Sequence, residues 1–149
     1  MKKLIGMTLV LALAVTMVGC GSGSKYLEDG KLKNTIDQTN ELDKYIIAIG
    51  LGAPSKDADS STQRKATSRN AAIVAAQYDL VGRIKGVKVE GGVTIQKAME
   101  TDSKISAIVN DSIQGAETTK TEWTSDDGCV VTMRIDKDKL AKQLNMKFE

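Results

Sequence analysis

The first twenty residues of this chain restrict its fold most, because they decide which residues remain to build a domain. Lys2 and Lys3 form a charged tip, and residues 4–18 are largely apolar. This run is shorter than the about 20 residues that a helix needs to cross a bilayer. A charged tip followed by a short apolar run is typical of a secretory signal peptide. We therefore exclude residues 1–19 from the folded domain.

A cysteine directly follows this segment. The sequence Met17-Val18-Gly19-Cys20 matches the lipobox of bacterial lipoproteins, in which the chain is cut before the cysteine and lipid is attached to its sulfur. We expect Cys20 to carry a diacylglycerol thioether and an acylated amine, typically palmitate. Several acyl chains hold a protein to a membrane far more firmly than one. A plain signal peptide or a short membrane anchor is the alternative.

The residue after the cysteine bears on the location. In Gram-negative lipoproteins an aspartate there typically causes retention in the inner membrane, whereas this chain has Gly21. We expect a lipid-anchored protein of the cell envelope, with the outer membrane favoured. Its membrane partner is lipid, through the acylated Cys20. The periplasmic and external faces both remain open.

The charge of the mature chain argues against nucleic acid as a partner. The full chain has 21 basic and 19 acidic residues, so removal of Lys2 and Lys3 leaves equal numbers of each. Nucleic-acid binding relies on a basic excess that meets the phosphates. We expect no nucleic-acid partner.

The remaining length suits one domain. We predict a lipidated cysteine and polar tether over residues 20–44 and a single domain over 45–149. Residues 26–43 are polar with scattered leucines, a pattern that also allows a short helix. Only 3% of the chain is aromatic, so the core must be aliphatic.

Alternation predicts a strand over residues 45–52. Tyr45, Ile47 and Ile49 lie on one face, and the other face tapers to Gly50 and Gly52. A face that ends in glycine lets another backbone approach closely.

A long helix is predicted over residues 61–85. Residues 60–63 have the spacing of a capping box, and Gly86 is a stop signal. We expect its buried stripe to contain Ala66, Ile73, Leu80 and Ile84. Asn70 and Gln77 lie beside that stripe, where they either line a pocket or make structural hydrogen bonds, the latter being favoured.

Several shorter elements follow. We predict a hairpin over residues 87–96 around a two-residue Gly-Gly turn, then a helix over 102–114. Two strands over 116–124 and 129–135 flank a turn at 125–128, and a final helix begins at Asp136 or Asp138. This order indicates an α+β fold, with a small, mainly antiparallel sheet and the long helix packed across one face. Such a sheet has open edges, which favour self-association.

The chemistry of the chain argues against catalysis. There is no histidine, which removes histidine zinc sites and the commonest general base. Asp126 and Asp127 resemble a carboxylate pair, but turn geometry explains them better. Gly50-Leu51-Gly52 is only half of a dinucleotide fingerprint. We expect no enzyme, no catalytic residue, and no cofactor or metal site.

Two single residues have alternative roles. Cys129 is the only cysteine besides Cys20, so it is either buried and inert, which we favour, or available for an intermolecular bond. Trp123 is the only tryptophan. We expect Trp123 to have a structural role. The alternative is that Trp123, Asn70 and Gln77 form a surface that binds a partner or a ligand.

Three segments together are similar to a known family. They are the strand at 48–52, the helix with Ala72, Ala76, Leu80 and Ile84, and the segment from Gly115 to Ile135. This arrangement resembles the LPP-twenty family of small outer-membrane lipoproteins, which includes flagellum-associated (FlgP-like) lipoproteins and the N-terminal domain of flagellar assembly protein T. The resemblance covers about residues 45–140. Cys129 departs from it, since the family often has threonine there.

The resemblance implies helix-on-sheet domains in the envelope and provides no catalytic or ligand residue. The first hypothesis is a non-enzymatic lipoprotein with a structural or assembly role, flagellum-associated if the resemblance holds. It would partner itself or another envelope protein. The alternative is a binding module that recruits or activates a cell-wall or envelope enzyme.

Overall fold

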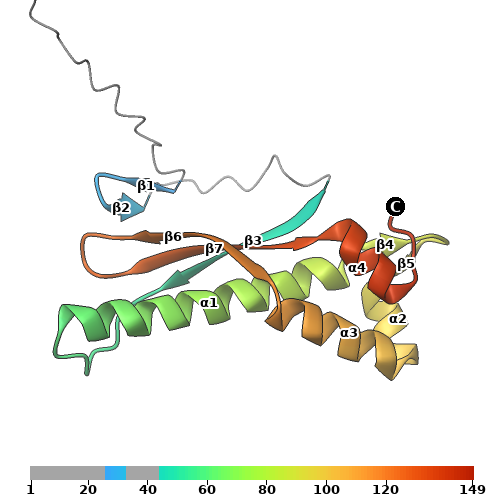
Figure 1. Ribbon diagram of the computed structural model, residues 1–149, viewed down its shortest axis with the longest axis horizontal. Coiled ribbons are helices and arrows are strands. Elements are labelled where there is room, and N and C mark those ends of the chain that lie inside the picture. The colour runs from blue at the N-terminus through green and yellow to red at the C-terminus, as the bar shows by residue number, and fades with distance from the viewer. Residues whose placement is uncertain (1–25, 33–43) are drawn as a thin grey trace, which may run out of the picture.

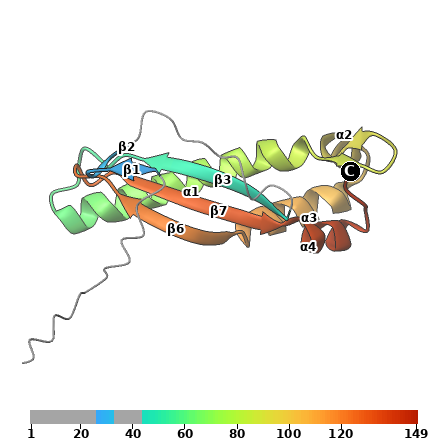
Figure 2. The same cartoon turned by 90° about the horizontal axis from the view of Figure 1, so that it is seen from above.

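A computed structural model describes residues 26–32 and 44–149. Its centre is a three-stranded antiparallel sheet in the order β3 (Tyr45–Gly52), β7 (Cys129–Asp136) and β6 (Glu117–Trp123). Figure 2 shows the three strands side by side. The helix α1 (Ser61–Lys85) runs along one face of this sheet (Figure 1). The predicted α+β fold, with a long helix across an antiparallel sheet, is confirmed.

The remaining elements are short and lie around this centre. They are β1 (Leu27–Glu28), β2 (Lys31–Leu32), β4 (Lys88–Val89), β5 (Val93–Thr94), α2 (Ile95–Thr101), α3 (Ser103–Gln114) and α4 (Lys137–Leu144).

Helix α1 approaches the sheet very closely at two glycines. A Cβ atom added at Gly50 would collide with the backbone of Ala72, and one added at Gly52 would collide with the backbone of Ser68. The backbones meet because neither glycine carries a side chain and the helix presents small residues. The predicted close approach at the glycine face of this strand is confirmed.

The buried line of α1 differs from the predicted stripe. It consists of Ser68, Ala72, Ala76, Leu80 and Ile84, at steps of four residues. Ala66 is exposed and Ile73 is only half-buried, so these two parts of the prediction are wrong. The close approach at Gly50 and Gly52 selects the smallest residues for the contact line, rather than the largest apolar ones.

The helix boundaries follow the predicted signals. Ser60 and Gln63 form the capping box of α1, and Gly86 ends the helix. Asp102 caps α3, and Gly115 ends it. For the last helix the cap is Asp136, one of the two candidates, whose carboxylate accepts a hydrogen bond from the backbone of Lys139.

The main core lies between α1 and the sheet, and α3 and α4 complete it. The strand β7 points alternate side chains toward α1. These inward side chains are Cys129, Val131, Met133 and Ile135. Ile105, Val109 and Ile113 of α3 and Leu140 and Leu144 of α4 join the same cluster.

The opposite face of the sheet is partly covered by the β1–β2 hairpin. Tyr26 and Leu27 are buried against Val130, with Ile49 beside them. Asp29 and Gly30 form the two-residue turn, both with positive φ (50° and 73°), as a type I′ turn requires. Residues 26–32 therefore form a hairpin, not the short helix that we considered. The rest of the expected tether lies outside the described residues.

The segment after α1 forms a hairpin, as predicted, but with different details. Val89 pairs with Val93, so residues 90–92 form a three-residue loop. Ile95 and Gln96 belong to α2 and not to a strand. These two residues are helical because the Thr94 hydroxyl accepts a hydrogen bond from the backbone of Lys97 and so caps the N-terminus of α2.

Candidate functional site

Cys20, where lipid attachment is expected, lies outside the described residues, as does the signal peptide. Attachment there stays a prediction. Within residues 26–32 and 44–149, no helix has the length and apolar character that a membrane span requires.

The structure does not unite the three residues predicted for a partner or ligand surface. Trp123 is half-buried at the end of β6 and packs against the main core. The Lys65 Nζ lies 5.7 Å from the centre of its ring. Asn70 is exposed and Gln77 is half-buried, both on α1. In the described part of the chain, no hydrogen bond or ring contact joins either to Trp123.

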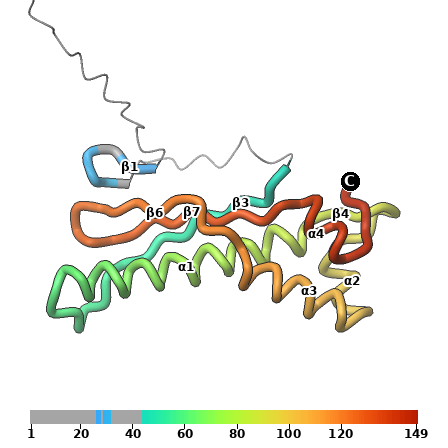
Figure 3. Tube along the Cα trace, viewed as in Figure 1, coloured from blue at the N-terminus to red at the C-terminus, as the bar shows by residue number. Residues whose placement is uncertain are grey.

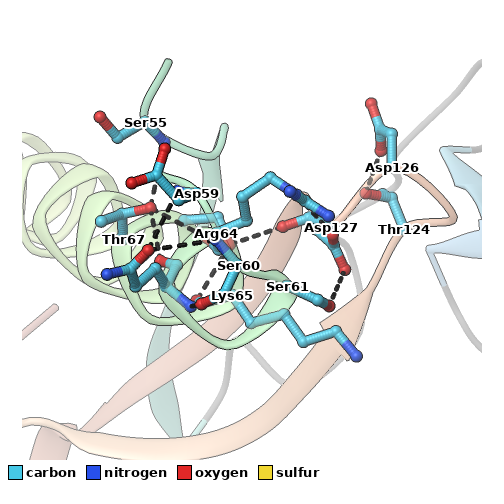
Figure 4. A network of polar contacts seen from close by, with 12 residues as sticks. Ser55, Asp59, Ser60, Ser61, Arg64, Lys65, Thr67, Thr124, Asp126 and Asp127 are labelled. Atoms are coloured by element: carbon cyan, nitrogen blue, oxygen red, sulfur yellow. Dashed lines mark hydrogen bonds and ion pairs between the residues drawn. The ribbon is translucent and has the colours of Figure 1, made fainter. Parts of the chain in front are cut away.

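The densest polar network joins the tip of the β6–β7 hairpin to the start of α1 (Figure 4). Arg64 Nε donates a 2.8 Å hydrogen bond to one carboxylate oxygen of Asp127, and the Ser61 hydroxyl donates to the other at 3.1 Å. The Ser68 hydroxyl donates to the backbone carbonyl of Asp127 at 2.7 Å. Figure 3 shows that this tip lies above the first turns of the helix. The network therefore fixes the end of the sheet to α1.

The two aspartates of this turn are both stabilised as carboxylates. The hydrogen bond from Arg64 lowers the pKa of Asp127. The hydrogen bond from Thr124 lowers the pKa of Asp126. A carboxylate pair used for acid–base catalysis needs one member with a raised pKa. The turn interpretation of Asp126 and Asp127 therefore accounts for the structure better than a catalytic pair.

A small cavity of about 330 Å³ lies where the sheet meets α3 and α4. On its wall Arg134 forms an ion pair with Glu117 at 2.9 Å and stacks over Tyr45, with 4.4 Å from the guanidinium carbon to the ring centre. Asp111, Asp136 and Lys139 also line it. The positive and negative side chains are mixed, so the cavity has no strong preference for ligands of one charge.

A larger open groove of about 1250 Å³ lies between the β4–β5 hairpin, α2 and α4. Val89, Ala98 and Phe148 contribute apolar surface. Its charged lining residues are Lys97, Lys137, Lys142, Lys147, Glu90, Asp138 and Glu149. The four lysines and three carboxylates nearly balance, so the groove also lacks a dominant charge.

The most unusual surface is the outer face of α1, which the sequence reasoning did not identify. We define the α1 outer face as Ala71, Val74, Ala75, Tyr78 and Gly82. Val74 is 64% exposed and Tyr78 is 82% exposed. The signal was present in the sequence, because residues 70–78 contain no charged residue although they lie in a surface helix.

Comparison with known proteins finds no relative of this chain. No family model, no curated protein and no solved structure matches this chain. In the described part of the chain, no group of three or more histidine, cysteine, aspartate or glutamate side chains is arranged to hold a metal ion.

Proposed function

We propose that this protein is a non-enzymatic lipoprotein of the bacterial cell envelope, anchored through Cys20, that works by assembling with protein partners. The lipobox Met17-Val18-Gly19-Cys20 behind a charged tip and a short apolar run carries the proposal. The resemblance to the LPP-twenty family favours the outer membrane and an association with an envelope machine such as a flagellar basal structure.

Two surfaces are candidates for an assembly role. The α1 outer face exposes Val74 and Tyr78 to solvent. The strand β6 is an edge strand, since β7 is its single partner among the described strands. Its register shift between Thr118 and Lys120 and its exposed Lys120 are devices that limit uncontrolled edge pairing. The apolar helix face is therefore the better candidate for a specific contact.

The position of Tyr26 limits how far the domain stands from its anchor. Tyr26 is buried in the domain, so the chain between the anchor and the domain runs only from Cys20 to Tyr26. Six residue steps span at most about 20 Å when fully extended. The lipid anchor would thus hold the domain close to the membrane surface.

Metabolic labelling with a palmitate analogue tests the anchor. The native chain should take up label and appear in the membrane fraction. Cys20→Ser should lose both, whereas the matched variant Cys129→Ser should keep both. Label that persists in Cys20→Ser, or a native chain without label in the soluble fraction, would overturn the proposal.

In-cell crosslinking with mass spectrometry of separated membranes tests the assembly role. Links to other copies or to components of an envelope machine would support it. Links mainly to a cell-wall enzyme would instead favour the alternative of a module that recruits or activates such an enzyme. The single Trp123 offers a second readout for that alternative, through its fluorescence with cell-wall fragments.

A further inference from the structure

The β1–β2 hairpin is the part of the folded domain that the chain from the expected anchor reaches first. Its strands have two residues each, with Leu27 paired to Leu32 and Glu28 paired to Lys31. The hairpin lies on the face of the sheet away from α1 and extends neither edge of the three-stranded sheet (Figure 1). An isolated two-stranded hairpin is marginally stable at best in water. Its position therefore depends on its contacts with the sheet.

These contacts form a small unit of their own within residues 26–32 and 44–149. Tyr26 and Leu27 are buried in a cluster with Val130, and this cluster is separate from the main core. A backbone hydrogen bond of 2.8 Å runs from the Ser125 N–H to the Gly30 carbonyl. Segments with few buried apolar contacts open at a lower free energy than the core of the same protein. The hairpin is thus the part of the described structure best suited to open alone.

The connectivity of the hairpin directs any pull on the anchor to its weakest end. The Leu27–Leu32 pair lies at the open end of the ladder, and Asp29 and Gly30 form the turn at the other end. The chain from the anchor enters before Leu27, and the chain to β3 leaves after Leu32. A pull between anchor and domain therefore loads the two ladder pairs one after the other, and not both at once.

We propose that the β1–β2 hairpin is a releasable latch that gives the anchored domain two different reaches. With the latch closed, the chain from Cys20 to Tyr26 spans at most about 20 Å. With the latch open, the first fixed point is Lys44, whose carbonyl accepts a 3.0 Å hydrogen bond from the Lys137 N–H. The 24 residue steps from Cys20 to Lys44 span at most about 80 Å. The two reaches rest on the proposed lipid anchor, whereas the opening of the latch does not.

The surface beneath the hairpin makes the opening reversible. Val130 is only 1% exposed when the latch is closed, and Ile49 packs beside it. Opening brings this apolar surface into contact with water, which is unfavourable, so the latch closes again when the pull ends. The longer reach lets the domain meet a partner that the closed state cannot touch, while the lipid stays in the membrane.

Two neighbouring residues of β7 report on different events. Val130 faces the hairpin, whereas Cys129 faces α1 in the main core. Exposure of residue 130 therefore requires the latch to open, and exposure of Cys129 requires the core to open. Cysteine behaves as a small apolar side chain, so Val130→Cys keeps the packing beneath the hairpin.

Thiol labelling of full-length chains in isolated membranes tests the latch. The native chain is compared with a chain that carries Val130→Cys and Cys129→Ser, and each rate is divided by that of the same chain in denaturant. Mass spectrometry of the peptide with residues 129 and 130 keeps Cys20 out of the measurement. We expect maleimide to modify residue 130 at least about tenfold faster than Cys129 while the domain stays folded. Equal rates would overturn the proposal, because the hairpin would then open only with the whole domain.

A covalent staple is the matched control. A Cβ atom built at Gly30 lies 3.3 Å from the Ser125 Cβ, close to the about 3.8 Å between Cβ atoms in disulfides. Gly30→Cys with Ser125→Cys, added to the Val130→Cys chain, should hold the latch closed when oxidised. Gly30 has a positive φ of 73°, so the oxidised and reduced forms of this one chain are compared with each other. Oxidation should slow the modification of residue 130 to the rate of Cys129. An unchanged rate with the disulfide formed would overturn the latch.

The same labelling with Cys20→Ser separates the latch from the anchor. Rapid modification of residue 130 in both backgrounds, or only with Cys20 present, supports the latch. Slow modification in both overturns it, and rapid modification only in Cys20→Ser would show that the anchored domain keeps a single reach. The palmitate label at Cys20 reports on the anchor independently of all these outcomes.

Discussion

The Arg64 guanidinium and the Asp127 carboxylate meet at 2.8 Å, although the two residues are 63 positions apart in the chain. Asp127 also adopts a positive φ of 64°, a conformation that aspartate tolerates better than most residues. Its side chain is therefore presented to α1 by a backbone turn, and Arg64 receives it at the first turns of the helix. This contact holds the tip of the β6–β7 hairpin against the N-terminal end of α1.

Replacement of Asp127 by Asn should make stability less dependent on pH. The pKa of Asp127 is lowered in the fold by the hydrogen bond from Arg64, below its usual value of 3.8. A lowered pKa means that the stabilisation is present above the unfolded pKa and is lost as pH falls through the folded pKa. We expect native and Asp127→Asn chains to differ in melting temperature at neutral pH and to converge as pH falls below about 4.

Thermal melts of both chains across this pH range provide the measurement. Asp29→Asn, at another positive-φ aspartate, is a control for the loss of a surface charge. A gap between native and Asp127→Asn that stays constant down to the lowest pH would contradict the role of the ion pair.

The two glycines Gly50 and Gly82 should respond in opposite ways to alanine. Gly50→Ala forces a methyl group into the backbone of Ala72, and overpacking of this kind costs typically 1–3 kcal/mol, with backbone atoms at the upper end. Gly82→Ala adds a methyl group to open space and should stabilise one copy by roughly 0.5–1 kcal/mol. Denaturant unfolding of both variants measures the two signs. Equal effects would mean that α1 does not approach the sheet as described.

Much of this fold could be predicted because its signals are local. The capping box at Ser60, the stop at Gly86 and the glycine face of β3 act over a few residues, and each appears in the structure as expected. The buried line of α1 depends instead on which strand it meets. Ile73 is larger than Ala72, yet Ala72 is buried because Gly50 lies against it. Which residues of α1 are buried therefore cannot be predicted from the sequence of the helix alone.

The first hairpin was missed for a different reason. Asp29-Gly30 is a strong turn signal, but each flanking strand has only two residues, too short for an alternating pattern. The α1 outer face was missed because helical periodicity was used to find one buried side. The uncharged run at residues 70–78 was a sequence signal for a second apolar side, and the exposure of Val74 and Tyr78 shows where that side lies.

Cys129 should be unreactive in the folded protein. It is buried, and burial raises the pKa of its thiol, so little thiolate is present near neutral pH. We expect maleimide to label Cys129 only after unfolding, with Cys129→Ser as the control that identifies the signal. Rapid labelling of the native protein, or a disulfide through Cys129 under native conditions, would support the alternative of an intermolecular bond.

Thr132 and Val131 are neighbours on β7 that face opposite sides of the sheet. Replacing Thr132 by valine and replacing Val131 by threonine should change the free energy of unfolding in opposite directions. The Thr132 hydroxyl is buried and has no hydrogen-bond partner in the described part of the chain. Such a group costs about 1–3 kcal/mol of desolvation, so Thr132→Val should raise the free energy of unfolding by about 1 kcal/mol. Val131→Thr puts a hydroxyl into the core beneath the sheet and should lower it by a similar or larger amount. Chemical denaturation of the two variants measures both changes. A loss of stability in Thr132→Val would show that this hydroxyl has a partner in the folded protein.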